Sequence, residues 1–478
     1  MLFRMIYDDR LAQAAYLIGC QKTGEAIIFD PQRDVDRYIE ASRREGLRLV
    51  GAAETHIHAD FLSGARELSE RIGAKVYVSD EGGADWSYQW LDKKISGGSY
   101  PHQKLKHNSA FFVGRIEFRV LHTPGHTPEH VSFLVTDRGG GATDPMGIIS
   151  GDFVFVGDVG RPDLLETAAG VQGAKEPSAR TLYKSLGMLL ELPEHLQVWP
   201  GHGAGSACGK ALGAVPQSTI GYERRHNAAI RAATSEDAFV SFILSGQPEP
   251  PLYFARMKRQ NRDGPRVLGD LPRPRHLTPG ELAGVDGRKT AILDTRPWPM
   301  FRESHASGAL FAPQDAMFPM VAGTYVKEEE EIVVVVEPSR VGEAIRDLVR
   351  IGLDKVVGWI EPGVLGDYER EGGKVESTRE VEVGEARKMV QGKKVFTLDV
   401  RRGDEFEAGH IEGATLGPYT RLPEVAGKLP KEKTILVNCR SGQRSARACA
   451  YLQRLGFEAV NLKGGFLAWD SPEGGGKA

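Results

Sequence analysis

Short apolar runs separated by loops rich in glycine and proline make up most of residues 1–265. Runs this short are typical of buried strands, because helices that cover a core need longer periodic stretches. Several runs lead into loops that carry histidine, aspartate and glycine; examples are AIIFD at 26–30, RLVGAAETH at 48–56, VSFLV at 131–135 and HLQVWPGH at 195–202. The pattern predicts a site built at strand ends on a layered α/β scaffold.

An internal repeat follows a segment rich in proline and arginine, 266–279, which predicts a linker. AILDTRPWPMFRESHASGA at 291–309 matches TLDVRRGDEFEAGHIEGA at 397–414, including three polar residues offset by 105 positions: Asp294 and Asp399, Arg296 and Arg401, and His305 and His410. Each copy reads as strand, loop, helix and strand, which predicts a small parallel α/β domain. We therefore expect three domains, at 1–265, 266–375 and 376–478.

Composition agrees with this organisation and excludes several partners. The 478 residues suit about three domains of ~150 residues each, and 41% hydrophobic and 26% charged residues are typical of globular proteins. A net charge of −3 predicts binding neither to nucleic acid nor to an anionic membrane. No apolar run reaches the ~20 residues of a membrane-spanning helix. Because Asp8, Asp9 and Arg10 interrupt any secretory core, we expect a cytoplasmic location.

The four cysteines, Cys20, Cys208, Cys439 and Cys449, are widely separated and contain no CxxC pair. So few thiols in so long a chain predict no disulfide framework. Three of them are expected to be buried apolar residues, and Cys439 is the exception discussed below.

Four segments concentrate the residues that bind metals: THIHADFLSG at 55–64, HTPGHTPEH at 122–130, SGDFVFVGDVGRPD at 150–163 and WPGHGAG at 199–205. A single histidine is more often a satisfied polar residue than a ligand. Four loops that each offer histidine or aspartate beside glycine instead favour a metal site.

These segments resemble the metallo-β-lactamase superfamily, whose HxHxDH, TPGH, GD and GH elements occur here in the same order over about residues 10–245. The implied fold is the αββα sandwich of that superfamily, followed by the two small parallel α/β domains. Phe61 departs from the pattern, because it stands where the second metal usually has a histidine ligand. Its presence argues against a two-zinc hydrolase. The amino-acid sequences of the four segments resemble those of the persulfide dioxygenase branch, particularly its members that are fused to rhodanese domains.

That branch implies one Fe(II) per chain, held by two histidines and one aspartate, which by motif are His56, His126 and Asp152. Such a set leaves open positions for a substrate sulfur and dioxygen. Three further residues would orient ligands or water, or serve only as polar support: His58, Asp60 and His202.

Arg161 resembles an arginine that lies near the iron in these dioxygenases. It would hold the substrate carboxylate or tune the surroundings of the ligands. Alternatively, it only pairs with Asp158 or Asp163.

A second constellation lies in TILVNCRSGQRSARACAYLQR at 434–454, which predicts a buried strand, a tight loop and an amphipathic helix. The N–H groups of the loop and the helix N-terminus form an anion cradle. With Arg440 and Arg444, this cradle should lower the pKa of the Cys439 thiol. Together with LDVR at 398–401 and GHIEGA at 409–414, the segment resembles a rhodanese. Ser445 replaces the arginine of the related phosphatases, which disfavours phosphatase activity.

The upstream copy has no cysteine between Val333 and Gly352 and has Glu337 near the nucleophile position. A carboxylate cannot carry sulfane sulfur. We therefore expect an inactive rhodanese-like domain that packs, positions or spaces its neighbours.

Together the resemblances imply an iron-dependent oxidation of a low-molecular-weight thiol persulfide to sulfite and thiol. This oxidation would be coupled to sulfane-sulfur transfer through Cys439 that forms or uses thiosulfate. The alternatives are a glyoxalase-type zinc thiolester hydrolase with appended rhodaneses and a non-oxidative sulfur carrier or sensor. The expected partners are small: thiol persulfides, dioxygen, sulfite and thiosulfate. A symmetric homo-oligomer would be ordinary for such an enzyme.

Overall fold

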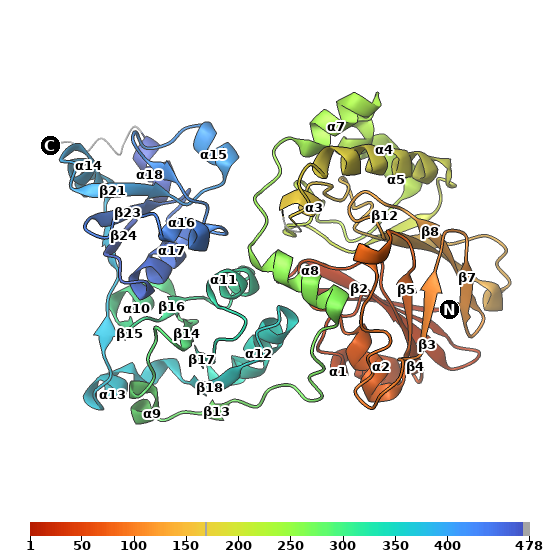
Figure 1. Cartoon of the computed structure of the whole chain (residues 1–478), viewed down its shortest axis with the longest axis horizontal. Coiled ribbons are helices and arrows are strands. Elements are labelled where there is room, and N and C mark those ends of the chain that lie inside the picture. The colour runs from red at the N-terminus through yellow and green to blue at the C-terminus, as the bar shows by residue number, and fades with distance from the viewer. Residues whose placement is uncertain (168–169, 472–478) are drawn as a thin grey trace. The chain divides into compact units, whose positions relative to one another are not determined.

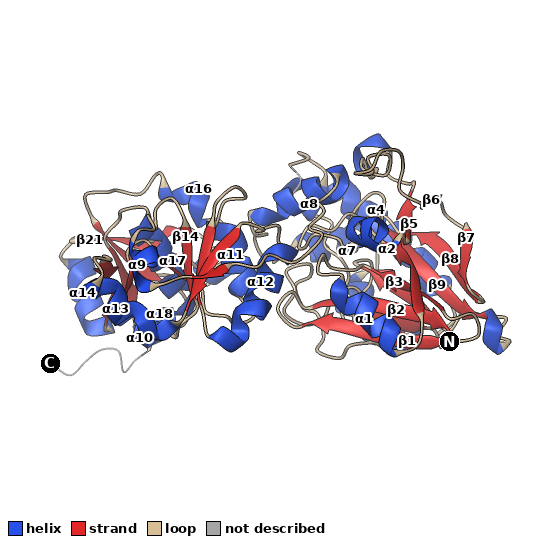
Figure 2. Cartoon of the chain, turned by 90° about the horizontal axis from the view of Figure 1, so that it is seen from below, coloured by secondary structure: helices blue, strands red, loops and turns tan. Residues whose placement is uncertain are grey.

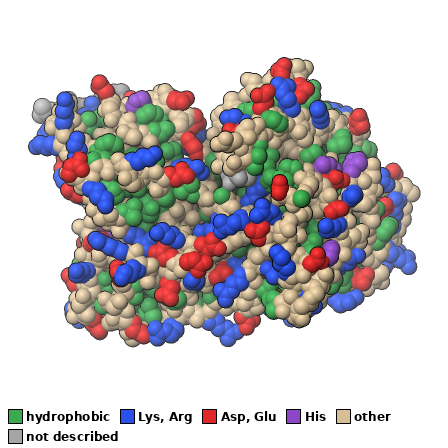
Figure 3. Space-filling view, in the orientation of Figure 1, with side chains coloured by type: hydrophobic (Ala, Val, Ile, Leu, Met, Phe, Trp, Pro, Cys, Tyr) green, Lys and Arg blue, Asp and Glu red, His purple; other side chains and the backbone are tan. Residues whose placement is uncertain are grey.

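The computed structural model describes residues 1–167 and 170–471. The chain divides into two compact units, Met1–Asp270 with Val349–Gly352, and Leu271–Leu348 with Leu353–Ala478. In Figure 1 the first unit runs from red to green and the second from green to blue. Basic and acidic side chains are interspersed over the face shown in Figure 3, in keeping with the small net charge.

The first unit contains two six-stranded sheets. The first has the order β1 (Leu2–Asp8), β2 (Gln13–Cys20), β3 (Glu25–Phe29), β4 (Arg48–Ala53), β5 (Lys75–Ser79) and β6 (His102–Leu105). The second has the order β12 (Ser218–Thr219), β11 (Gln197–Pro200), β10 (Gly147–Gly151), β9 (Val131–Asp137), β8 (Ile116–His122) and β7 (Ala110–Val113). Strands β3 to β6 are parallel, as are β10 and β11, and the other pairs are antiparallel.

Alternating side chains explain how these sheets stack. Along β2, Tyr16 and Ile18 join a core that also contains Phe118 and Phe133 of the second sheet, whereas Leu17 points to the opposite face. Successive strand residues face opposite sides, so a strand that is apolar throughout must be covered on both. Helices provide the outer cover: α1 (Asp36–Arg44) and α2 (Ala65–Ile72) lie on the first sheet, and α4 (Lys175–Glu191) and α7 (Glu236–Leu244) lie on the second (Figure 1; helices are blue and strands red in Figure 2). The expected αββα sandwich is confirmed.

The remaining helices of this unit connect the layers or follow them. They are α3 (Leu164–Thr167), α5 (Ile220–His226), α6 (Ala228–Ala232) and α8 (Tyr253–Asp263). None of the helices within the described ranges combines the length and apolar character that crossing a bilayer requires.

The second unit holds two five-stranded parallel sheets with the same strand order. The middle module, 271–376, has β13 (Arg275–His276), β18 (Val356–Ile360), β17 (Ile332–Val335), β14 (Ala291–Asp294) and β16 (Leu310–Phe311). The C-terminal module, 379–471, has β20 (Arg379–Val381), β24 (Ala459–Leu462), β23 (Thr434–Asn438), β21 (Val395–Asp399) and β22 (Thr415–Leu416). A two-stranded ribbon, β15 (His305–Ala306) with β19 (Val375–Glu376), closes the middle module.

Five helices in each module follow the same sequence of elements. They are α9 (Pro279–Ala283), α10 (Trp298–Glu303), α11 (Phe318–Tyr325), α12 (Val341–Arg350) and α13 (Leu365–Arg370), and then α14 (Val383–Gln391), α15 (Gly403–Glu407), α16 (Leu422–Ala426), α17 (Gln443–Arg454) and α18 (Gly465–Asp470). The predicted linker is too long, because Arg275 and His276 already pair with β18. A two-residue edge strand has too little apolar sequence to be recognised.

Candidate metal and thiol sites

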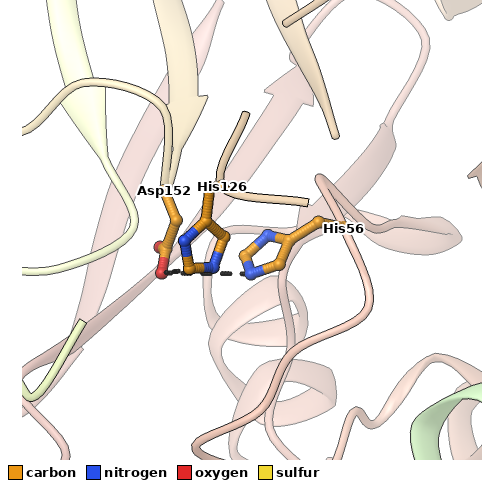
Figure 4. Close-up of side chains that lie close together, drawn as sticks. All are labelled: His56, His126 and Asp152. Atoms are coloured by element: carbon orange, nitrogen blue, oxygen red, sulfur yellow. Dashed lines mark ion pairs between the residues drawn. The ribbon is translucent and has the colours of Figure 1, made fainter. Parts of the chain in front are cut away.

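The three residues predicted to hold the metal converge from three strand ends (Figure 4). His56 follows β4, His126 lies in the loop between β8 and β9, and Asp152 follows β10. The Nε2 atoms of His56 and His126 lie 3.9 Å and 3.5 Å from Oδ2 of Asp152. All three side chains are buried.

Hydrogen bonds orient both histidine rings. Nδ1 of His56 lies 2.9 Å from Oγ1 of Thr55, whose hydroxyl donates to Asp30 at 3.0 Å. The hydroxyl proton is therefore committed, so Thr55 accepts from Nδ1–H of His56. Nδ1 of His126 lies 3.0 Å from the carbonyl oxygen of Arg161 and must donate to it. Both rings thus present the lone pair of Nε2 toward Asp152, which is the tautomer that a metal ligand needs.

The protonation states also suit a cation. Burial, together with neighbouring histidines, lowers the pKa of His56 and His126 well below the usual range, which keeps both rings neutral. Burial raises the pKa of Asp152 to about 6. Both carboxylate oxygens of Asp152 are buried without a hydrogen-bond partner among the described residues. Such oxygens are costly unless a cation compensates them, so the donor set fits a bound metal ion.

His58 points away from this centre. Its Nε2 lies 3.1 Å from Oδ1 of Asp30 and 3.2 Å from Oε2 of Glu54. Burial opposes the charged ring, but the two carboxyl groups outweigh burial and raise the pKa of His58 well above the usual range. Nε2 of His58 is thus used in an ion pair.

Arg161 forms the pair that the sequence left as an alternative. Its Nε and Nη2 donate to Asp163 at 3.0 Å and 2.6 Å, and its Nη1 donates to the carbonyl of Ala207 at 3.0 Å. The guanidinium is buried and makes these three hydrogen bonds. The backbone carbonyl of Arg161, and not its side chain, contacts the metal centre, because it accepts a hydrogen bond from Nδ1 of His126.

Asp60 and His202 form a second cluster together with Cys208, a thiol that the sequence had assigned only to packing. Nδ1 of His202 lies 3.0 Å from the Ala12 carbonyl, and its Nε2 lies 3.3 Å from Asp60 and 3.5 Å from Oδ1 of Asp152. Burial, aided by Asp60 and Asp152, raises the pKa of Cys208 well above the usual range. The buried Phe61 offers no donor atom and lies 4.4 Å, ring to ring, from His58.

Lys258 is a further residue that the sequence did not reveal. Its Nζ lies 4.0 Å from the ring centre of Trp86, and burial lowers its pKa to about 8. Its charge contributes to the low pKa of His56 and His126. On the same helix, α8, Asn261 donates to the carbonyls of His58 and Phe61 at 2.9 Å and 2.7 Å. Helix α8 is therefore bound to the metal-binding loop.

The thiol site lies at the end of β23, where the buried Cys439 begins a tight loop before α17. Its Sγ accepts hydrogen bonds from the N–H of Gly442 at 3.1 Å and from Oγ of Ser445 at 3.4 Å. Gly442 has a φ of +92°, a conformation that favours glycine. Arg444 binds Glu405 through two hydrogen bonds of 2.6 Å and 2.7 Å, so part of its charge is offset. Arg440 is exposed.

The repeated Asp, Arg and His make the same contacts in both modules. Nε of Arg296 donates to Asp294 at 3.0 Å, and Nε of Arg401 donates to Asp399 at 3.0 Å. His305 stacks on Phe301 at 3.9 Å, and His410 stacks on Phe406 at 3.8 Å.

Strand register identifies the residue of the middle module that corresponds to Cys439. Asp399 pairs with Asn438, which precedes Cys439, and Asp294 pairs with Val335, which precedes Val336. The buried Val336 therefore occupies the position of Cys439, and Glu337 corresponds to Arg440.

Comparison with known proteins agrees with this architecture. Residues 8–202 match the model of the metallo-beta-lactamase superfamily, and residues 382–472 match that of the rhodanese-like domain. A crystal structure of a metallo-beta-lactamase from Staphylococcus aureus is 41% identical and covers 76% of this chain and 99% of its own, with a TM-score of 0.68. The chain belongs to the metallo-beta-lactamase superfamily. It also carries a C-terminal rhodanese-like domain.

Two further similar proteins match about half of this chain. The crystal structure of ETHE1 from Myxococcus xanthus is 28% identical, covers 55% of this chain and 99% of its own, and has a TM-score of 0.43. A beta-lactamase hydrolase-like protein of Agrobacterium fabrum is 28% identical over 254 residues, which are 49% of this chain and 53% of the relative. The chain thus spans about half the length of this relative and of a similar one from Xylella fastidiosa.

Proposed function

We propose that the first unit is a mononuclear iron persulfide dioxygenase. The observation that carries the proposal is a donor set of two neutral imidazoles and one carboxylate, with His58 paired to carboxyl groups and Phe61 in place of a further ligand. Two histidines and one carboxylate with open positions are typical of Fe(II) enzymes that use dioxygen. When bound, the iron supplies the activation of dioxygen. The balanced reaction is RSSH + O₂ + H₂O → RSH + SO₃²⁻ + 2H⁺.

The proposed second activity is sulfur transfer at Cys439. The thiolate attacks the outer sulfur of a persulfide, and the sulfur–sulfur bond of the donor breaks. The departing inner sulfur takes up the proton that the outer sulfur loses and leaves as the thiol. Cys439 is left with a bound persulfide anion, which sulfite attacks to give thiosulfate and the free thiolate. The hydrogen bonds from Gly442 and Ser445 to Sγ support this role, because donors at that position stabilise a sulfur anion.

The middle module fits an inactive rhodanese-like domain. Its sheet order and its Asp, Arg and His contacts match those of the C-terminal module, and Val336 stands where the nucleophile would be. A valine carries no sulfur.

One experiment separates this proposal from a zinc thiolester hydrolase and from a sulfur carrier. Metal analysis of the purified chain is combined with an oxygen electrode and a thiolester assay. Iron with persulfide-dependent oxygen uptake supports the dioxygenase. Zinc with thiolester cleavage, or neither metal nor turnover, would contradict it.

We expect about one metal ion per chain. Phe61 removes one imidazole from the position of a second ion, and Asp60, His202 and Cys208 remain. Metal analysis of the unmodified chain and of Cys208→Ser should therefore give the same content. Two tightly held ions in the unmodified chain, one of which is lost in Cys208→Ser, would overturn the mononuclear assignment. Phe61→His should admit a second zinc ion.

Lys258, whose charge acts on His56 and His126, is the cation that a carboxylate of glutathione persulfide would need. Lys258→Met keeps an apolar stem but removes the charge, so KM for glutathione persulfide should rise about tenfold, because a charge-assisted contact contributes roughly 1.5–3 kcal/mol. KM for an alkyl persulfide that has no carboxylate should stay the same in oxygen-uptake assays. Lys184→Met, an exposed lysine of α4, is the matched control. An equal rise for both persulfides would contradict a role in binding the glutathione carboxylates.

A further inference from the structure

The two modules of the second unit share the helix that follows the catalytic loop. Ala446 and Ala450 of α17 belong to the same apolar cluster as Phe301 and Phe311 of the middle module. Arg447, also on α17, forms an ion pair with Asp315 of the middle module. The helix that fixes the Cys439 loop is therefore packed partly against the module that lacks a nucleophile.

A cavity of about 310 Å³ lies where these modules meet. One side consists of the catalytic-loop residues Ser441, Gly442 and Gln443, and another consists of the aromatic rings of Trp298 and Phe311. Gly442 both lines the cavity and donates its N–H to Sγ of Cys439. The cavity thus borders the same backbone residue that contacts Sγ of Cys439.

Trp298 is held across the boundary between the modules. Its indole N–H donates to Oε1 of Glu380 in the C-terminal module at 2.7 Å, and its ring lies 5.1 Å from that of Phe311. Pro297 and Pro313 extend the apolar wall that these rings form. The middle module thus supplies a rigid apolar surface to the cavity beside the catalytic loop.

The charges of the cavity are balanced. Arg447 is paired with Asp315, and Lys463 is paired with Glu382. A cavity with an apolar wall and paired charges suits an organic molecule better than an inorganic dianion, which needs unpaired cations. Its volume also lies at the lower end of the range for small organic ligands, roughly 300–1,000 Å³.

We propose that this composite cavity binds the organic part of a low-molecular-weight thiol persulfide that donates sulfur to Cys439, with Trp298 of the middle module as its main contact. The inference rests on the proposed sulfur transfer at Cys439 and names the donor class. The reaction is the transfer already described, in which the persulfide sulfur passes to Cys439 and the organic thiol leaves with the proton. The module without a nucleophile is thereby part of the substrate site.

The test compares two sulfur donors in the full chain without oxygen, with cyanide as the common acceptor and the spontaneous reaction subtracted. Trp298→Ala should raise KM for glutathione persulfide about tenfold and leave KM for thiosulfate within about twofold. Trp298→Phe keeps an aromatic ring without the indole N–H and should restore most of the affinity. Trp359→Ala removes an equal side chain from β18 of the same module, outside the lining residues, and should change neither constant.

A binding measurement separates this inference from the proposed transfer itself. S-methylglutathione, which cannot react, is titrated calorimetrically into full-length Cys439→Ser with and without Trp298→Ala. About tenfold weaker binding in the double variant is expected. If the unmodified chain transfers sulfur from neither donor, the proposed sulfurtransferase activity is wrong. The titration still shows whether the cavity binds the organic part of the donor. Unchanged binding, or equal changes in KM for both donors, would overturn the cavity as a donor site.

Discussion

His126→Ala should lose most of its iron, and with it persulfide-dependent oxygen consumption. Among the described residues, three donors converge at this centre, and the carbonyl of Arg161 orients His126. Removing an outer hydrogen-bond partner of a metal ligand typically costs roughly 10- to 100-fold in metal affinity or activity. Loss of a ligand itself should cost at least as much. His56→Ala and Asp152→Ala are expected to behave alike, as measured by metal analysis and an oxygen electrode.

Two controls make the result specific. Sulfurtransferase activity should survive in all three variants, because Cys439 lies in the other unit. His122→Ala changes a half-buried histidine near the same loop, bound to the Pro128 carbonyl, and should keep its iron. Full oxygen uptake by a ligand variant would remove that residue from the donor set.

The convergence of His56, His126 and Asp152 could be predicted because each lies within a short motif that follows a strand. The side chains of these three residues meet when the two sheets stack. The apolar sequence of the strands dictates that stacking. Cys208 and Lys258 could not be found in this way. Cys208 lies in a loop outside the helices and strands. Lys258 acts on His56 and His126 from helix α8, which Asn261 binds to the loop at 58–61.

In the second unit, prediction from the sequence is limited for a different reason. The Asp, Arg and His of the repeat could be matched by sequence because polar residues with a structural role recur at a fixed offset. The loop after β17 has no cysteine to align, so the sequence alone places Glu337 near the nucleophile position. Pairing between parallel strands sets the register instead, and it assigns that position to Val336. The cavity wall of Trp298 and Phe311 likewise depends on how two modules pack, which no local pattern encodes.

Cys439→Ser should leave oxygen consumption with persulfide nearly intact and change the product from thiosulfate to sulfite. The serine hydroxyl is not appreciably ionised at neutral pH and forms no stable persulfide, so the hydrogen bonds from Gly442 and Ser445 would have no sulfur anion to stabilise. Glu337→Gln is the matched control in the middle module and should alter neither activity, because its loop has no nucleophile. Chromatography of sulfite and thiosulfate after thiol trapping measures both products. If Cys439→Ser makes thiosulfate at the original rate after subtraction of the spontaneous reaction, Cys439 does not perform this transfer and the two sites are not coupled.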